Sequence, residues 1–425
     1  TKCQEAWKFP ISPERSAELG LPRPLLHSTV LVEESVQETH RLMEALPSHA
    51  GALLGVSVNV IHGYRETCQA AYRGIVQPHP EDKRVCSAAW LNDDDISRFL
   101  KSLPNWTNLK AQKTMQGRKS MKRDDTVEEE SPEDVRQRNI KEAEILASNL
   151  AEGGINSHEI ISDVAQLKCL ALLQESMEWF SWRIVQFTSQ LQRTRSSHQH
   201  QSSGNIPSIS VTNADGIPAV PEGTVIALEN LSHEFEELAN TCLLVLHLEV
   251  RVQCFYYLLP RGSSRFNTNS QDPDPKVMEL SRVLTSIDEA MTSSLQPRKS
   301  KYVFEGLGHL IAKILMSSSQ FLDTIDESGI HRMCRNIFTM QQTLTNITMA
   351  REVALDHANH YFQLFYLTPE DILNRVLETG PEFSELEYMN AFQLIHRSQP
   401  QTDPSAIQRH LQRLSDILGE VGVTV

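Results

Sequence analysis

The chain has 425 residues, which is long for one compact domain and predicts two or three folding units. Apolar residues make up 40% of it and charged residues 22%, which is typical of globular proteins and excludes a chain that is disordered throughout. The formal net charge of −14 repels nucleic acid and anionic lipid head groups, so we expect no nucleic-acid partner.

The first 109 residues predict a helical bundle that follows an irregular start. The chain begins with Thr1 and no charged-then-apolar signal segment follows, so we expect a piece of a longer protein. Prolines at positions 10, 13, 22 and 24 disfavour a long helix before Leu25. Beyond them, apolar residues three or four positions apart predict helices over Leu25–Leu46, Leu53–Val76 and Asp93–Leu103.

Two polar stretches, 110–131 and 193–223, predict disordered loops. The first runs from a basic block, Lys110 to Arg123, into the acidic residues Glu128–Glu130 and holds almost no apolar anchor. The basic block alone suits anionic lipid head groups, but the acidic residues that follow it favour a solvated loop. Between the loops, Ser131 places a capping side chain ahead of a proline and begins the predicted helices of 132–192.

The clearest helical pattern lies in the last segment, 224–425, which we assign to a C-terminal helix bundle. Apolar residues recur there three and four positions apart, which places them in one stripe along a helix. Four stripes predict four amphipathic helices, from Leu231 to Val245, Val277 to Met291, Phe304 to Ile314 and Ile330 to Ile347. Asp274 and Thr368 each precede a proline and predict helix starts, Gly380-Pro381 ends a helix, and Phe383 to Ile395 predicts a final long one.

These elements predict an all-α fold. Helices joined by short links pack antiparallel, and successive antiparallel helix bundles laid end to end form an elongated rod. The seven cysteines are scattered and odd in number, which suits reduced, cytosolic thiols. The longest apolar runs, Gly51–Ile61 and Cys242–Leu248, are shorter than the roughly 18 residues of a membrane-spanning helix, so we expect a soluble protein.

Metal and cofactor motifs are weak in this sequence. His357 and His360 share a helix face, but a solvated or core-edge pair is favoured over a metal site, and His198 and His200 fall in the second predicted loop. The segment Gly306-Leu-Gly308 resembles half of a dinucleotide-binding fingerprint. It lacks the third glycine and a preceding strand, so we interpret it as close helix packing.

One apolar helix carries charged residues that invite a functional interpretation. The segment Cys242–Leu259 is apolar nearly all round, which predicts a buried helix, yet it contains His247, Glu249 and Arg251. A buried carboxylate must find a cation or hydrogen-bond donors, and a structural pair with Arg251 or with a residue of another helix is favoured over catalysis. We therefore predict no catalytic residue, no cofactor, no metal and no enzymatic activity.

Six long segments closely resemble one known family. They are Ala70 to Gln77, Asp93 to Trp106, Cys242 to Pro260, Phe304 to Ile311, Glu327 to Glu352 and Ser384 to Gln399. Taken in this order, they are similar to the C-terminal portion of the exocyst complex component four family. The similar part of this chain runs from about Leu21 to Gln399. The resemblance is weakest in the two polar loops.

This resemblance implies a helical rod of the class shared by multisubunit tethering complexes. It would help to tether secretory vesicles to the plasma membrane before fusion, without enzymatic activity. The implied partners are other exocyst subunits. The implied location is the cytoplasm, with recruitment to the plasma membrane and secretory vesicles by peripheral association through the complex.

Some family members end in a tail that binds PDZ domains, and this chain ends Val423, Thr424, Val425. The terminal valine is kept but the hydroxyl is displaced by one position, which weakens the case for PDZ proteins as partners. Two other functions stay open. One is a helical regulator of a small GTPase, an exchange or activating domain with active residues on helix surfaces. The other is an adaptor scaffold outside any tether.

Overall fold

The structure is a computed structural model that describes residues 9–21, 23–78, 84–116, 130–150, 154–200, 222–259, 272–399 and 404–422. The described residues form α-helices and short 3-10 helices, and an isolated antiparallel bridge joins Pro10 and Leu26. The prediction of an all-α fold is confirmed. The chain divides into two compact units, each assembled from segments that are far apart in the sequence.

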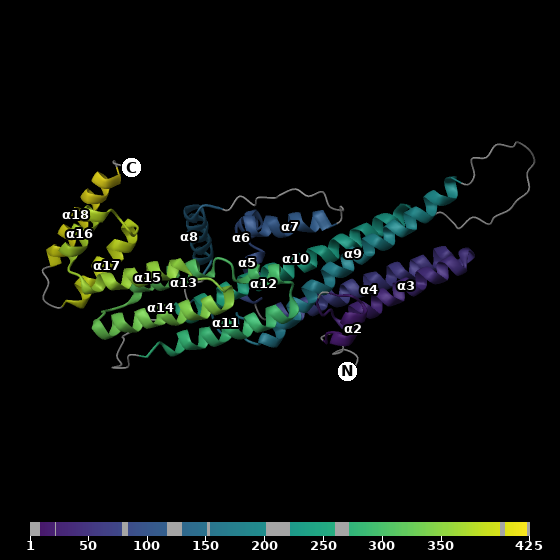
Figure 1. Ribbon diagram of the computed structural model, residues 1–425, viewed down its shortest axis with the longest axis horizontal. Coiled ribbons are helices and arrows are strands. Elements are labelled where there is room, and N and C mark those ends of the chain that lie inside the picture. The colour runs from purple at the N-terminus through teal and green to yellow at the C-terminus, as the bar shows by residue number, and fades with distance from the viewer. Residues whose placement is uncertain are drawn as a thin grey trace, which may run out of the picture. The chain divides into compact units, whose positions relative to one another are not determined.

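The first unit comprises Thr1–Val85, Asp163–Leu246 and Glu289–Ser300. Its helices are α2 (Pro13–Glu18), α3 (His27–Ala45), η2 (Pro47–His49), α4 (Ala50–Val76), α9 (Val164–His200) and the first part of α10 (Glu222–Leu258). Helices α3 and α4 lie side by side as a hairpin (Figure 1). Tyr64 of α4 contacts two other helices of this unit. The centroids of its ring and of the Phe180 ring on α9 are 5.6 Å apart, and its hydroxyl lies 2.6 Å from Thr29 Oγ1 on α3.

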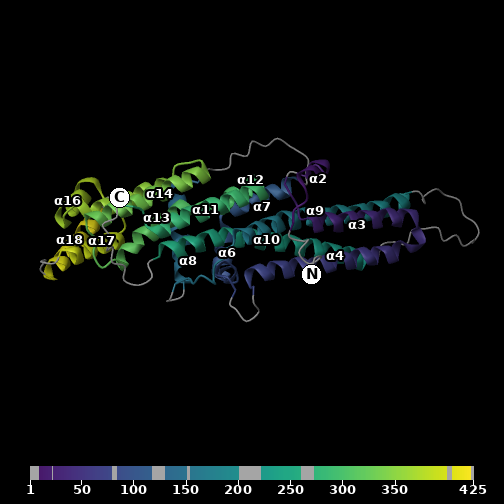
Figure 2. The same ribbon diagram turned by 90° about the horizontal axis from the view of Figure 1, so that it is seen from below.

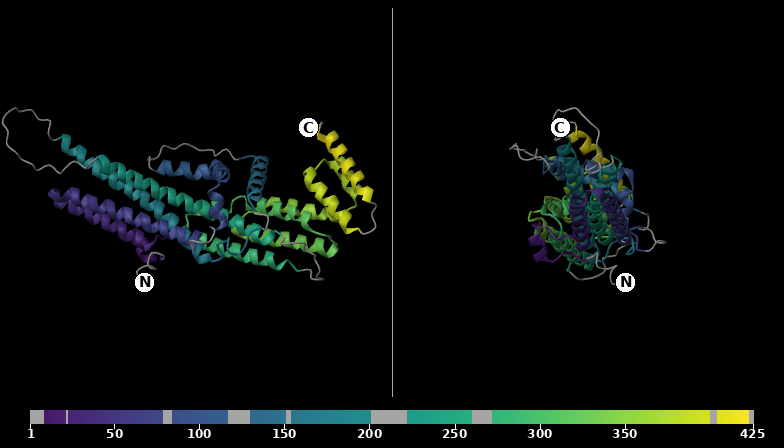
Figure 3. Two further views of the ribbon diagram at one scale, coloured as in Figure 1. Left: turned by 180° about the vertical axis from the view of Figure 1, so that it is seen from behind. Right: turned by 90° about the vertical axis from the view of Figure 1, so that its right-hand side faces the viewer.

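The second unit comprises Cys86–Ser162, His247–Asp288 and Lys301–Val425. It begins with α5 (Cys86–Leu91), α6 (Asp94–Ser102), α7 (Pro104–Gln116) and α8 (Pro132–Ser148), and it contains the end of α10. Helices α11 (Pro275–Ser294) and α12 (Pro297–Phe304) are divided between the two units. Then follow α13 (Leu307–Ser318), η3 (Ser319–Phe321), α14 (Glu327–Thr348), α15 (Val353–Gln363), η4 (Leu364–Tyr366), α16 (Pro369–Thr379), α17 (Glu385–Ser398) and α18 (Pro404–Gly422). Figure 2 shows α13 and α14 among these helices, and Figure 3 shows the yellow C-terminal group α16 to α18 from behind.

The predicted start signals act as helix caps. The Ser131 hydroxyl accepts a hydrogen bond from the Asp134 amide, and Thr368 and Asp371 form a reciprocal capping box at the start of α16. Gly380 ends α16 with φ of 83°, a left-handed conformation that glycine adopts without strain. The predicted stripes lie in the core, since Leu231, Leu284 and Ile337 are all buried.

Several boundaries differ from the sequence expectations. The stripe from Phe304 to Ile314 is divided between α12 and α13, because Gly306 adopts a left-handed φ of 78° between them. Helix α7 continues to Gln116 and α9 to His200, so both enter stretches that were expected to be loops. Helix α18 follows α17, which was expected to be the last helix. The expected domains were consecutive segments of the chain, whereas the compact units interleave such segments.

Candidate functional site

Helix α10 is a long apolar helix that nevertheless buries charged side chains. It is the one helix in the described part of the chain that is long and apolar enough to cross a membrane. Of the apolar window that meets this criterion, 94% is buried inside the protein, as expected for the core helix of a globular fold. Its last turns, within the second unit, bury His247, Glu249, Arg251 and Gln253.

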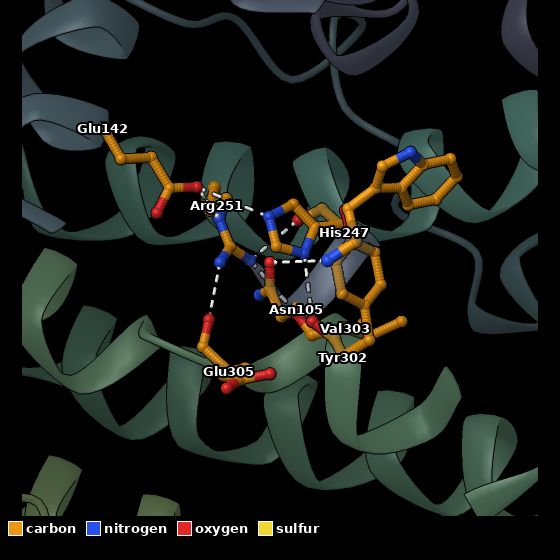
Figure 4. A network of polar contacts seen from close by, with 8 residues as sticks. Asn105, Glu142, His247, Arg251, Tyr302, Val303 and Glu305 are labelled. Carbon is orange, nitrogen blue, oxygen red and sulfur yellow. Dashed lines mark hydrogen bonds and ion pairs between the residues drawn. The ribbon is translucent and has the colours of Figure 1, made fainter. Parts of the chain in front are cut away.

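Glu142 of α8 and Arg251 of α10 form a buried ion pair (Figure 4). The Arg251 Nε donates to Glu142 Oε1 at 2.6 Å, and both side chains are almost completely shielded from solvent. Burial opposes ionisation of Glu142, but the positive charge of Arg251 and the hydrogen bond that it donates outweigh burial and lower the pKa of Glu142 to about 2. The pair therefore stays charged at neutral pH.

Arg251 also binds the end of α12, where helix carbonyls lack partners within the helix. It donates to the carbonyl oxygens of Val303 at 3.1 Å and Glu305 at 2.7 Å, and to that of His247 at 3.1 Å. A guanidinium has five N–H donors in a planar fork, so one side chain reaches α8 and α12 from α10. Its positive charge also suits the C-terminal end of a helix.

His247 completes the cluster as a neutral ring. Its Nδ1 lies 3.0 Å from the Tyr302 carbonyl oxygen, which can only accept, so Nδ1 carries the proton. The ring stacks on Tyr302 with centroids 4.5 Å apart, and Nε2 lies 3.4 Å from Glu142 Oε1. Burial first, and the Arg251 charge second, lower the pKa of His247 to about 4.

Glu249 belongs to a separate polar cluster. Its carboxylate accepts hydrogen bonds from Ser87 Oγ at 2.6 Å, the Ile161 amide at 2.8 Å and Gln253 Nε2 at 2.9 Å. Burial raises the pKa of Glu249, against the effect of these three donors. The sequence left open a pair with Arg251 or a residue of another helix. The structure does not pair Glu249 with Arg251: Glu249 binds neutral donors that include Ser87 of helix α5, and Arg251 binds Glu142 of helix α8.

The first unit contains a third buried cluster, around Lys299 of α12. The Lys299 Nζ lies 2.9 Å from Glu175 Oε1, 2.5 Å from Glu178 Oε2 and 3.0 Å from Gln174 Oε1, all on α9. Lys299 is only 4% exposed, so the whole side chain lies in the core. Three acceptors match the three hydrogens of the ammonium group, and the cluster fixes α12 on α9.

Sequence reasoning missed Glu142, Lys299 and Tyr302 as members of these clusters. For Glu142 a signal was available, because α8 buries Asn139, Glu142, Ala143 and Leu146, which follow one helical stripe. A carboxylate on such a stripe indicates a buried partner. Lys299 lies in a short helix of 8 residues that gives no comparable stripe.

The other candidate residues do not converge on a reactive site. His357 and His360 both face Glu382, with Nδ1 to Oε1 distances of 3.9 Å and 2.9 Å. Among the residues that the structure describes, no three His, Cys, Asp or Glu side chains are placed to hold a metal ion. A Cβ on Gly308 would collide with the side chain of Glu352, so close packing there is confirmed, against the residue that caps α15.

Three cysteine thiols are held protonated within the folded units. Burial raises the pKa of Cys68, Cys86 and Cys254 to about 12, which keeps these thiols protonated and unreactive at neutral pH. The candidate PDZ-binding residues, Val423 to Val425, lie outside the described residues. The side chains of His198 and His200 and most of the basic block at 110–123 also lie outside them.

The chain is similar to proteins named exocyst complex component 4. It is 49% identical over 435 residues to the one from Drosophila melanogaster, an alignment that covers 99% of this chain and 43% of that protein. It is 42% identical over 426 residues to the human one, covering 99% of this chain and 42% of that protein. The Caenorhabditis elegans protein is 33% identical over 353 residues, covering 80% of this chain and 37% of that protein. The chain thus spans less than half the length of these relatives, and no protein-family model matches it.

Proposed function

Because the chain belongs to the exocyst complex component 4 family, we propose that it forms part of a non-enzymatic exocyst subunit that helps to tether secretory vesicles to the plasma membrane before fusion. The observation that carries the proposal is the alignment of 99% of the chain with relatives of that name in fly, human and mouse. The names of these relatives describe a component of a complex. Membership of the complex is therefore the first part of the proposal.

The chemistry of the core supports a role without catalysis. Glu142, His247 and Arg251 bind one another and backbone carbonyls, and Glu249 and Lys299 have their hydrogen-bonding capacity used within their own units. Charged groups used in this way hold helices together and are unavailable for proton transfer to a substrate. A tether needs stiff, packed helices and a polar surface for other proteins, and the folded units supply both.

The proposed partners are other exocyst subunits, and the proposed location is the cytoplasm, with recruitment to vesicles and the plasma membrane through the complex. None of the relatives carries a name that describes a regulator of GTPases, so that alternative is without support. An adaptor outside any tether would share the fold but not the partners. The set of proteins bound in cells therefore separates the two.

Affinity purification tests the proposal. A tagged copy of the 425-residue chain is expressed in cells and the co-purifying proteins are identified by mass spectrometry. We expect other exocyst subunits to be enriched over a tag-only control. A variant with Leu284→Asp, which places a charge in the core, should lose them, while the exposed Met278→Asp retains them. A folded chain that recovers no exocyst subunit contradicts the proposal.

A further inference from the structure

Helix α8 buries a much smaller share of its residues than helix α13, on which it packs. Only Asn139, Glu142, Ala143 and Leu146 are buried among its 17 residues, and two of these four are polar. Helix α13, on which α8 packs, buries nine of its 12 residues. In Figure 1, α8 runs across the direction of α13. Helices with few buried apolar contacts open locally before the rest of a domain unfolds.

The ion pair of Glu142 is therefore the principal polar attachment of α8. The Arg251 Nε is the donor that reaches Glu142, at 2.6 Å. The other Arg251 bonds, to the carbonyls of His247, Val303 and Glu305, belong to α10 and the end of α12. If α8 leaves, these bonds still hold the guanidinium in place, with its Nε–H directed at the vacated position. The surface beneath α8 is thus a preformed receptor for a carboxylate.

The polar atoms around this attachment are incompletely matched. Asn139 Nδ2 and Arg138 Nε on α8, and His309 Nδ1 on α13, are buried and have no hydrogen-bond partner among the described residues. Asn139 is 4% exposed, so its unpaired amide is shielded from solvent. Buried donors without acceptors weaken an interface. A different helix could therefore bind the same surface with fewer unmatched groups.

We infer that α8 is an exchangeable occupant of this surface, which α6, α10 and α13 form, and that a partner helix of matching chemistry competes with it. The partner is an amphipathic helix with a glutamate for Arg251, a small residue directly after it and a leucine four positions after it. These requirements follow from Glu142, Ala143 and Leu146, which α8 itself buries. Positive Arg251 and the glutamate supply the charge complementarity. The inference is independent of the proposed tethering function, because it concerns one helix and its receptor.

Hydrogen exchange of the 425-residue chain at pH 7 tests whether α8 leaves its surface more readily than the neighbouring helix opens. We expect amides of α8 to exchange at least about tenfold faster than those of α13. Glu142→Gln should accelerate exchange in α8 by about a hundredfold, because it leaves Arg251 without its anion. The matched control is Glu144→Gln, an exposed position on the same helix, which should leave exchange unchanged. Equal rates for α8 and α13 in the unmodified chain, or for Glu142→Gln and wild type, overturn the inference.

A labelled peptide of residues 131–148 tests whether another helix of matching chemistry binds the surface that α8 occupies. It should bind the Glu142→Gln chain and bind the unmodified chain at least about tenfold more weakly, because the unmodified α8 occupies the surface. The same peptide carrying Glu142→Gln should bind neither. Circular dichroism confirms that the variant chain is folded. No binding of the wild-type peptide to the folded Glu142→Gln chain, or equal binding of the two peptides, contradicts the exchange of helices.

Discussion

Lys299 allows the sharpest test of the buried ionic clusters. We consider Lys299→Met, which keeps most of the side-chain volume and removes the charge. The ammonium group lies within 3.0 Å of oxygens on Gln174, Glu175 and Glu178, and Lys299 itself is 4% exposed. Without it, two carboxylates on one face of α9 face each other with no cation between them. Removing one member of a buried ion pair leaves an uncompensated buried charge.

The expected loss is about 3–5 kcal/mol of the free energy of unfolding at pH 7. Each hydrogen bond to a charged group contributes a net of roughly 1.5–3 kcal/mol to stability. The sum over the bonds of Lys299, less the stabilisation gained by burying the apolar methionine, is of the same order. Urea unfolding followed by circular dichroism measures the change.

An exposed ion pair provides the control. Arg351 binds Asp356 through two hydrogen bonds of 2.8 Å and 3.0 Å, so the geometry is as good, but the pair lies at the surface. Arg351→Met should change stability little, because water and salt screen this exposed pair. The double variant Lys299→Met, Glu175→Gln should recover part of the loss. If Lys299→Met costs no more than Arg351→Met, burial does not strengthen this cluster and the reasoning fails.

Two further predictions rest on the same structure, and a third rests on the sequence of the chain end. Leu284→Asp should destabilise the protein by several kcal/mol, because Leu284 is fully buried. The control is Met278→Asp on the same helix, which should not destabilise the protein, because Met278 is 41% exposed. Unchanged thermal unfolding of Leu284→Asp would contradict the helix assignment. Stability should fall as the pH is lowered from 6.5 to about 4, because His247 is buried and neutral in the folded protein and takes up a proton on unfolding. Stability should fall further below pH 4.5, because unfolding then also lets Glu142, whose pKa in the folded protein is about 2, take up a proton. A His247→Gln variant should lack the first part of this fall in urea titrations. A peptide ending in Val425 should lose PDZ binding when that residue is replaced by Asp, and an equally weak wild-type peptide would end the PDZ hypothesis.

The helical elements could be predicted because their signals are local. Apolar spacing places Leu231, Leu284 and Ile337 in stripes, and capping residues such as Ser131 and Thr368 mark where helices begin. The break at Gly306 was missed, because an uninterrupted stripe conceals a single left-handed residue. Its cause is conformational, and hydrophobic periodicity does not report backbone dihedral angles.

The pairing of buried charges could be predicted only in part. His247, Glu249 and Arg251 were evident as charged residues in an apolar helix, which requires partners for them. The identity of the partners depends on which helices pack together, and Glu142 is more than one hundred residues from Arg251 in the sequence. Glu249 and Arg251 are two positions apart on α10, a spacing that directs their side chains to different faces of the helix and prevents them from pairing. Tertiary packing instead provides Glu249 with Ser87, the Ile161 amide and Gln253.

Small-angle X-ray scattering of the 425-residue chain tests most directly whether these packed helices form a stiff spacer. A rod of successive helix bundles has a larger radius of gyration than a compact globule of the same chain length. A compact globule of 425 residues has a radius of gyration of about 22 Å. We predict a larger value and an asymmetric distance distribution. A value near that of a globule, with a symmetric distribution, would contradict the account of the chain as a spacer.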